Sequence, residues 1–214
     1  MDKYEDGGLT VLRFGPLGPF ANNAYIIGHA ESKDAFIVDM PSGSAEVVTA
    51  VKQDGWIVKA ILLTHSHNDH WMDYDLVKTD TQAPVLAHEA ERGVLGSRID
   101  SPIADGQELQ VGPYYLHAIH TPGHTPGSTC FKVQRFLFSG DTLFPGGPGR
   151  TQTPANFKQT VESIKTRLLT LPDETQVLTG HGDGTTIGAS RREIADFDAR
   201  KHADDLCGDV IWAS

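Results

Sequence analysis

The sequence is short of cysteine, of positive charge and of long apolar runs. Its two cysteines, Cys130 and Cys207, cannot form a disulfide framework, so a reducing cytoplasm is the expected compartment. Its 18 basic and 28 acidic side chains give a formal net charge of −10, which disfavours binding to nucleic acid or to an anionic membrane. No apolar run approaches the roughly 18 residues of a spanning helix, and the polar residues 1–6 are unlike a signal peptide.

The composition fits one folded domain spanning residues 1–214. An apolar fraction of 39% is enough for a core, and a charged fraction of 21% is too low for a disordered chain. The 22 glycines and 12 prolines predict many turns and disfavour a helical bundle. No repeat, low-complexity tract or linker divides the chain.

Short apolar and β-branched runs predict strands, several of which lead directly into polar loops. Strands are expected at Leu9–Phe14, Asn23–Gly28, Ala35–Val38, Trp56–Leu63, Tyr114–Ile119, Ser128–Val133, Phe136–Ser139 and Gln176–Leu178, the sixth paired with the seventh. Helices are expected at Ser44–Gln53, Asp73–Lys78, Pro154–Leu169 and Ala189–Asp205. The third helix has the clearest signal, because Thr153 can act as N-cap with Pro154 at the first helical position.

Ten histidines in an acidic chain are unusual, and five of them gather in three short polar segments. These segments are residues 64–70, 121–128 and 179–184, and Asp141 lies between the last two. Each segment follows a predicted strand, an arrangement that collects functional residues at one edge of a sheet. The other histidines are scattered and are interpreted as structural or surface residues: His29, His88, His117, His120 and His202.

The clustered residues have the chemistry of a metal site, since imidazole nitrogen and carboxylate oxygen suit zinc, iron or manganese. The candidate ligands are His65, His67, Asp69, His70, His124, Asp141 and His181. Seven ligands exceed what one tetrahedral ion needs, so two ions are expected. An accidental cluster in a solvated loop explains the first segment poorly. For His124, Asp141 or His181 taken singly, a plain turn is the competing interpretation.

The motifs, taken in order, resemble those of the metallo-β-lactamase superfamily. They are Thr64–His70, Thr121–Ser128 around His124, Gly140–Thr142 and Gly180–Gly182, and Asp39 after an apolar strand fits the family's opening. The continuations at 143–151 and 185–188 are typical of the glyoxalase II-like branch. The resemblance implies an α/β (α+β) fold, a four-layer αββα sandwich with two facing sheets and the metals at one edge.

The resemblance also implies how the ligands divide. His65, His67 and His124 would hold one ion, Asp69, His70 and His181 the second, and Asp141 would bridge the two. Zinc is the favoured metal, with iron or manganese as alternatives. The aspartate at position 141 argues against the true β-lactamases, and His67 argues against the electron-transfer diiron branch.

The sequence departs from the family in two places. Trp71 and Met72 stand where many relatives have glycine, which puts the packing of the next helix in doubt. Only about thirty residues follow His181, so the helical extension with which glyoxalase II binds glutathione is absent or very short, and no glutathione-binding residue is carried over.

The predicted activity is hydrolysis of a small-molecule thioester or related ester. The two ions would lower the pKa of a water to near neutral, hydroxide would attack the carbonyl, and Asp69 would orient it and accept a proton as the catalytic residue. One alternative is a persulfide dioxygenase-like oxidoreductase, in which His65, His124 and Asp141 would hold a single iron. Lactone hydrolysis is a nearer variant. A non-catalytic scaffold and RNA cleavage are disfavoured, because all seven positions are filled and the chain is acidic.

Three further expectations concern the surroundings of the site. Cys130 should be a small buried residue of a strand, and neither cysteine should be a nucleophile. Arg191 and Arg192 should lie on a solvated helix face. The loops at 15–22 and 144–153 should border the site, although they carry no charge pattern that identifies a substrate.

Overall fold

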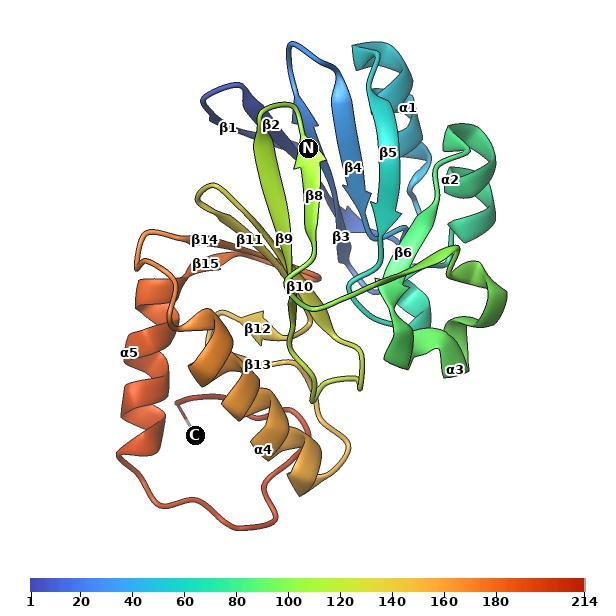
Figure 1. Cartoon of the computed structure of the whole chain (residues 1–214). Coiled ribbons are helices and arrows are strands. Elements are labelled where there is room, and N and C mark those ends of the chain that lie inside the picture. Colours follow the sequence, from blue (N-terminus) through green and yellow to red (C-terminus); the bar gives the residue numbers. More distant parts are fainter. Residues whose placement is uncertain (214) are drawn as a thin grey trace.

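The computed structural model describes residues 1–213 and contains two large β-sheets packed face to face, with helices on both outer faces (Figure 1). The first sheet has seven strands in chain order: β1 (Asp2–Asp6), β2 (Leu9–Leu17), β3 (Asn22–His29), β4 (Asp34–Val38), β5 (Ile57–Leu62), β6 (Val85–His88) and β7 (Ser101–Ile103). Strands β1 to β4 are antiparallel, whereas β4 to β7 run parallel.

The second sheet has six strands, and a short hairpin lies beside it. In spatial order the strands are β15 (Thr185–Thr186), β14 (Gln176–Thr179), β11 (Phe136–Gly140), β10 (Thr129–Val133), β9 (Tyr114–His120) and β8 (Glu108–Val111). The hairpin consists of β12 (Leu143–Phe144) and β13 (Gly147–Pro148). Strands β10 and β11 pair as predicted, and β11 runs parallel to β14.

Helices cover the outer face of each sheet. The first sheet carries α1 (Ala45–Asp54), α2 (Tyr74–Thr81) and α3 (Arg92–Leu95), and the second carries α4 (Pro154–Ser163), its π-helical continuation η4 (Ile164–Leu168), and α5 (Ile187–Asp198) (Figure 1). Three short 3₁₀ turns complete the structure: η1 (Asn68–His70), η2 (Glu89–Glu91) and η3 (Gly96–Arg98). Within residues 1–213, no helix is long and apolar enough to cross a bilayer.

The buried apolar residues form three clusters, one for each interface between the four layers. Ile26 and Ile37 pack under α1, whereas their neighbours Ile27 and Phe36 face the second sheet. This alternation follows from the two-residue period of a strand, which sends successive side chains to opposite faces. Leu137 of β11 packs with the third cluster, under α4 and α5. The predicted αββα sandwich is therefore confirmed.

The predicted strands are all present, with shifts of a few residues at their ends, but some elements were not predicted. The missed strands are short or polar: β1, β6, β7, β8, β12, β13 and β15. The expected helix at Ala189–Asp205 is wrong at both ends, because α5 begins at Ile187 and ends at Asp198. His202 explains the early end, since its ring stacks on Phe197 and donates a hydrogen bond from Nε2 to the Phe197 carbonyl at 2.7 Å.

Candidate metal centre

The seven predicted ligands all lie at one edge between the sheets, just after the ends of strands. His65 and His67 follow β5, Asp69 and His70 belong to η1, His124 lies between β9 and β10, Asp141 follows β11, and His181 follows β14. The carboxyl ends of the parallel pairs β4–β5 and β11–β14 meet here, the usual place for a site in such sheets. The fold therefore brings together residues that are more than a hundred positions apart in the sequence.

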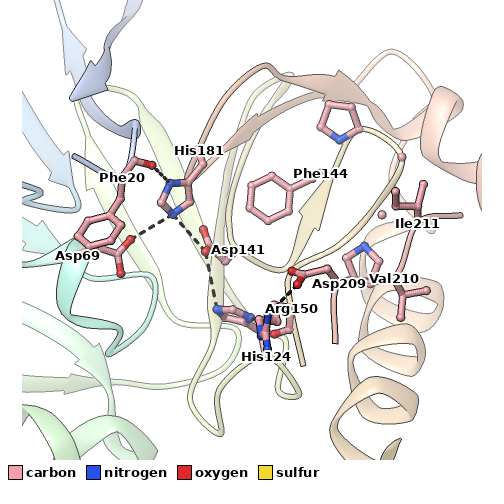
Figure 2. Close-up of a pocket in the computed structure, with 15 residues that line it drawn as sticks. Phe20, Asp69, His124, Asp141, Phe144, Arg150, His181, Asp209, Val210 and Ile211 are labelled. Carbon is pink, nitrogen blue, oxygen red and sulfur yellow. Dashed lines mark hydrogen bonds and ion pairs between the residues drawn. The ribbon is translucent and has the colours of Figure 1, made fainter. Parts of the chain in front are cut away.

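Their ligand atoms form three groups in which all atoms lie within 4.8 Å of one another. The groups are His65, His67 and His124; Asp69, His70 and His181; and His65, His70 and Asp141. In the first, His67 Nδ1 lies 3.1 Å from His65 Nε2 and 2.9 Å from His124 Nε2. In the second, His70 Nε2 and His181 Nε2 are 3.2 Å apart. Asp141 Oδ2 faces both, at 3.8 Å from His124 Nε2 and 3.4 Å from His181 Nε2 (Figure 2).

Backbone carbonyls fix the orientation of two of these imidazole rings. His124 donates from Nδ1 to the carbonyl oxygen of Arg150 at 2.8 Å, and His181 donates from Nδ1 to that of Phe20 at 2.9 Å. In both rings this leaves Nε2 directed into the centre. Such outer contacts are typical of metal-binding histidines, because they set the tautomer and the ring angle.

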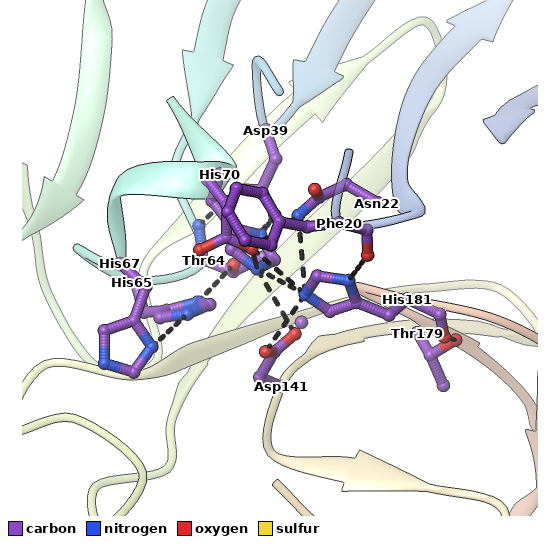
Figure 3. A network of polar contacts seen from close by, with 12 residues as sticks. Phe20, Asn22, Asp39, Thr64, His65, His67, His70, Asp141, Thr179 and His181 are labelled. Carbon is purple, nitrogen blue, oxygen red and sulfur yellow. Dashed lines mark hydrogen bonds and ion pairs between the residues drawn. The ribbon is translucent and has the colours of Figure 1, made fainter. Parts of the chain in front are cut away.

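Asp39 organises two further rings from beneath the centre. Its Oδ2 accepts hydrogen bonds from His70 Nδ1 at 2.8 Å and from Thr64 Oγ1 at 2.9 Å. Because the Thr64 hydroxyl donates to Asp39, it can accept from His65 Nδ1, which lies 3.0 Å away. Asp39 is buried, in a left-handed conformation with φ of 60°. A single carboxylate thus supports one histidine directly and another through a hydroxyl (Figure 3).

The sequence analysis missed most of these supporting contacts. Asp39 was noted only as part of the family resemblance, although it follows a buried strand just as the ligands do, and that signal could have identified it. Asn22 also supports the centre, donating from Nδ2 to Asp69 Oδ2 at 2.8 Å. The carbonyls of Phe20 and Arg150 have no sequence signal, because every residue carries one.

The electrostatics of the centre favour a bound cation. Burial would raise the pKa of Asp141, but the charge of His70 and hydrogen bonds from His181 and His70 hold it well below its usual value. Burial would lower the pKa of His181, yet Asp141 and Asp69 raise it to about 10. Burial lowers the pKa of both His65 and His124. The carboxylates are thus ionised, and they raise the pKa of His70 as well, so they hold positive charge on His70 and His181 that a bound cation would supply instead.

Two packing features fit the bridging role implied for Asp141. Its Oδ1 is buried and, within residues 1–213, makes no hydrogen bond of good geometry, since its contact with His70 Nε2 is long at 3.4 Å; this is expected of an atom that faces a cation. Gly180 lies so close that a Cβ there would be 2.1 Å from this oxygen, and a Cβ at Gly149 would be 2.9 Å from His124 Nδ1. The residues present therefore fit a pair of divalent cations.

A cavity of about 730 Å³ opens beside the centre, and Figure 2 shows the residues that line it. Asp69, His124, Asp141 and His181 form one part of its wall. Phe20 and the segment 144–150 form another, so both predicted bordering loops contribute. The C-terminal residues 209–211 complete the wall, which the sequence did not predict. A second cavity of about 510 Å³ meets the centre at His67 and His124.

The structure also settles the expectations about the surroundings. Trp71 donates from Nε1 to the Ser66 carbonyl at 3.0 Å and packs against the first core cluster, so a large residue is accommodated before α2. Cys130 is buried in β10, as predicted. The solvated position predicted for Arg191 is wrong in part, because Arg191 donates hydrogen bonds to the carbonyls of Leu169 and Leu171. It anchors α5 and does not approach the centre.

Comparisons with known proteins agree with this geometry. A family model described as the metallo-beta-lactamase superfamily matches residues 17–181. The chain is 35% identical over 193 residues to the probable metallo-hydrolase YqgX of Bacillus subtilis, covering 80% of this chain and 90% of that protein. It is 33% identical over 202 residues to the hydroxyacylglutathione hydrolase GloC of Haemophilus influenzae, covering 83% and 93%.

Solved structures resemble the whole fold. The BLEG-1 B3 metallo-beta-lactamase superimposes with a TM-score of 0.75 at 32% identity, covering 85% of this chain and 96% of that one. ETHE1 from Myxococcus xanthus gives 0.73 at 26% identity, covering 85% and 82%. TTHA1623, in a di-iron-bound form, gives 0.72 at 31% identity, covering 85% and 97%.

Proposed function

The chain belongs to the metallo-β-lactamase superfamily, and we propose that it hydrolyses thioesters or related esters with two divalent metal ions. The observation that carries the proposal is the grouping of the ligand atoms. Two of the three groups are the two sets that the resemblance assigns to separate ions, and Asp141 faces both. A pair of ions is a common device for hydrolysis. Zinc is the favoured metal, and the di-iron form of TTHA1623 supports iron as an alternative.

When bound, two divalent cations supply Lewis acidity toward a carbonyl oxygen and make water more acidic. The chain supplies the rest. Asp69 lines the cavity, and Asn22 holds its Oδ2 at 2.8 Å. Hydrogen bonding to His181 and the charge of His70 keep the pKa of Asp69 low despite its burial, so this carboxylate is ionised and can orient a water by accepting a hydrogen bond from it.

The reaction adds water across the carbon–sulfur bond and yields a carboxylic acid and a thiol. Because a thiolate leaves readily, no dedicated acid is required for it. Phe20 and Phe144 provide apolar surface in a cavity of about 730 Å³, a size suited to a small molecule. The hydrolase names of YqgX and GloC support the reaction class. The free thiols of Cys130 and Cys207 suit a reducing compartment, so we expect the enzyme to act in the cytoplasm.

The test is to replace ligands and measure metal content and turnover together. Asp141→Ala and His124→Ala should each lose bound metal, by elemental analysis, and should also lose hydrolysis of acyl-N-acetylcysteamine thioesters. His117→Ala is a matched control, because His117 pairs with Glu108 away from the centre and should leave both quantities unchanged. Full metal content and full turnover in Asp141→Ala would overturn the proposal.

The single-iron oxidoreductase is less well supported by the geometry. It needs only His65, His124 and Asp141, and it leaves no role for the second group of ligand atoms around His181. One experiment on protein purified without added metal distinguishes the hydrolase from the oxidoreductase, by metal content and oxygen consumption. Two ions and oxygen-independent hydrolysis support the hydrolase, whereas one iron with oxygen consumption would support the oxidoreductase.

A further inference from the structure

The C-terminal segment, residues 206–213, returns to the candidate metal centre and forms part of the cavity wall. After α5 the chain returns to the hairpin β12–β13, where Trp212 contacts the turn at Gly146. Asp209, Val210 and Ile211 line the cavity (Figure 2). The wall opposite consists of the candidate ligands and Phe20. A substrate bound at the centre would therefore extend toward this segment.

Backbone contacts on both sides of Asp209 hold the segment in place. Gly208 and Thr151 exchange two hydrogen bonds, at 2.9 and 3.1 Å. Trp212 donates from its backbone nitrogen to the Gly146 carbonyl at 2.7 Å, and its side chain is only 1% exposed in the third core cluster. The position of Asp209 is thus fixed by its neighbours and not by its own side chain.

Asp209 pairs with Arg150, a cationic side chain of the cavity wall that is not one of the candidate ligands. Its Oδ2 lies 2.7 Å from Arg150 Nη1, and the two side chains are 73% and 72% exposed. Of the described residues that line the cavity, Arg150 alone is a lysine or arginine. The other acidic residues there, Asp69 and Asp141, belong to the candidate metal centre. An ion pair this exposed contributes little to stability, so its location in the cavity is its more important property.

We propose that Asp209 is a specificity-determining residue, and this inference rests on the proposed function. A lone guanidinium in this wall would attract a substrate carboxylate and hold it by charge-assisted hydrogen bonds. Asp209 compensates that charge and would repel the same carboxylate. The part of the cavity beside Arg150 and Asp209 therefore selects thioesters whose group at that place carries no negative charge.

The experiment compares two thioesters with the same acyl group and different thiols. Acetyl-N-acetylcysteamine is uncharged, and acetyl-3-mercaptopropionate carries one carboxylate. In metal-loaded protein, Asp209→Asn should raise the ratio of kcat/KM for the anionic to the neutral substrate by about two- to fivefold, in line with an exposed ion pair. The increase should shrink at high ionic strength. Relative to wild type, the ratio should not rise in the Arg150→Gln, Asp209→Asn double variant, because the guanidinium that Asp209→Asn leaves unpaired is then absent.

Asp205→Asn is the matched control. It removes the same charge from the nearby chain but does not line the cavity, so the ratio should not change. An unchanged ratio in Asp209→Asn, or an increase that persists without Arg150, would overturn the inference while the protein still hydrolyses thioesters. If the metal-loaded wild type hydrolyses neither thioester, the proposed function fails and the inference fails with it.

Discussion

At the scale of single residues, the support beneath the candidate metal centre matters as much as the ligands. Asp39 accepts hydrogen bonds from His70 and from Thr64, and all three residues are buried. Asp39→Asn should keep the fold, because asparagine has the same shape and tolerates the φ of 60°. Asp39 accepts from the Thr64 backbone nitrogen at Oδ1 and from the other two donors at Oδ2, so in either orientation the amide nitrogen of asparagine would face a donor, and metal affinity should fall by about 10- to 100-fold. Competition with a chelating dye measures this directly.

Asp34→Asn provides the comparison for that variant. Asp34 begins β4, the strand that Asp39 follows, but pairs with Lys59 at the surface at 3.6 Å. Its replacement should leave metal affinity unchanged. If both variants bind metal like the wild type, the support assigned to Asp39 is wrong.

The two cysteines should differ in reactivity. Burial raises the pKa of the Cys130 thiol to about 11, so at pH 8 only about 0.1% of it would be thiolate, whereas Cys207 is exposed. Iodoacetamide at pH 8 should therefore label Cys207 alone in the native protein and both residues in urea. Peptide mass spectrometry identifies the labelled sites. Rapid native labelling of Cys130 would contradict its burial in β10.

At the scale of elements, the sequence predicts best where one signal dominates. Trp56–Leu63 is almost wholly apolar, and it contains β5, whose second half, residues 60–62, is buried just before the ligand loop. β1, by contrast, is the polar segment DKYED and becomes a strand only because β2 offers it an edge to pair with. The end of α5 depends on His202 folding back onto Phe197, a contact that helical periodicity cannot reveal. The candidate ligands could be selected from the sequence because metal chemistry restricts residue type, while the backbone carbonyls that orient them could not.

The loop after β14 must approach β11 closely, and Gly180 allows this approach. A Cβ at Gly180 would lie 2.1 Å from Asp141 Oδ1 and 2.8 Å from His70 Cε1. Gly180→Ala should therefore displace both candidate ligands and reduce metal content and turnover by about tenfold or more. Gly93→Ala in α3 meets no atom within 4 Å and should change neither. Elemental analysis and thioester assays on both variants test the difference, and a fully loaded Gly180→Ala protein would contradict the geometry.

At the scale of the whole molecule, the candidate metal centre joins the two halves of the sandwich. His65, His67, Asp69 and His70 follow a strand of the first sheet, whereas His124, Asp141 and His181 follow strands of the second. Each of the two ion groups draws ligands from both sheets. Bound cations would thus cross-link the sheets, in addition to the apolar cluster between them.

Metal should therefore stabilise the whole protein and not only its active site. A metal ion present at 100 times its Kd adds about 2.7 kcal/mol to the free energy of unfolding. For a chain of this length, that raises Tm by roughly 5–10 °C per ion. Chelation should lower Tm by a comparable amount and abolish hydrolysis, and added zinc should restore both. Differential scanning calorimetry across a zinc titration measures the shift, with Asp141→Ala as the variant in which it should largely vanish. A Tm that is independent of zinc in the wild type would mean that the seven side chains do not bind cations between the sheets.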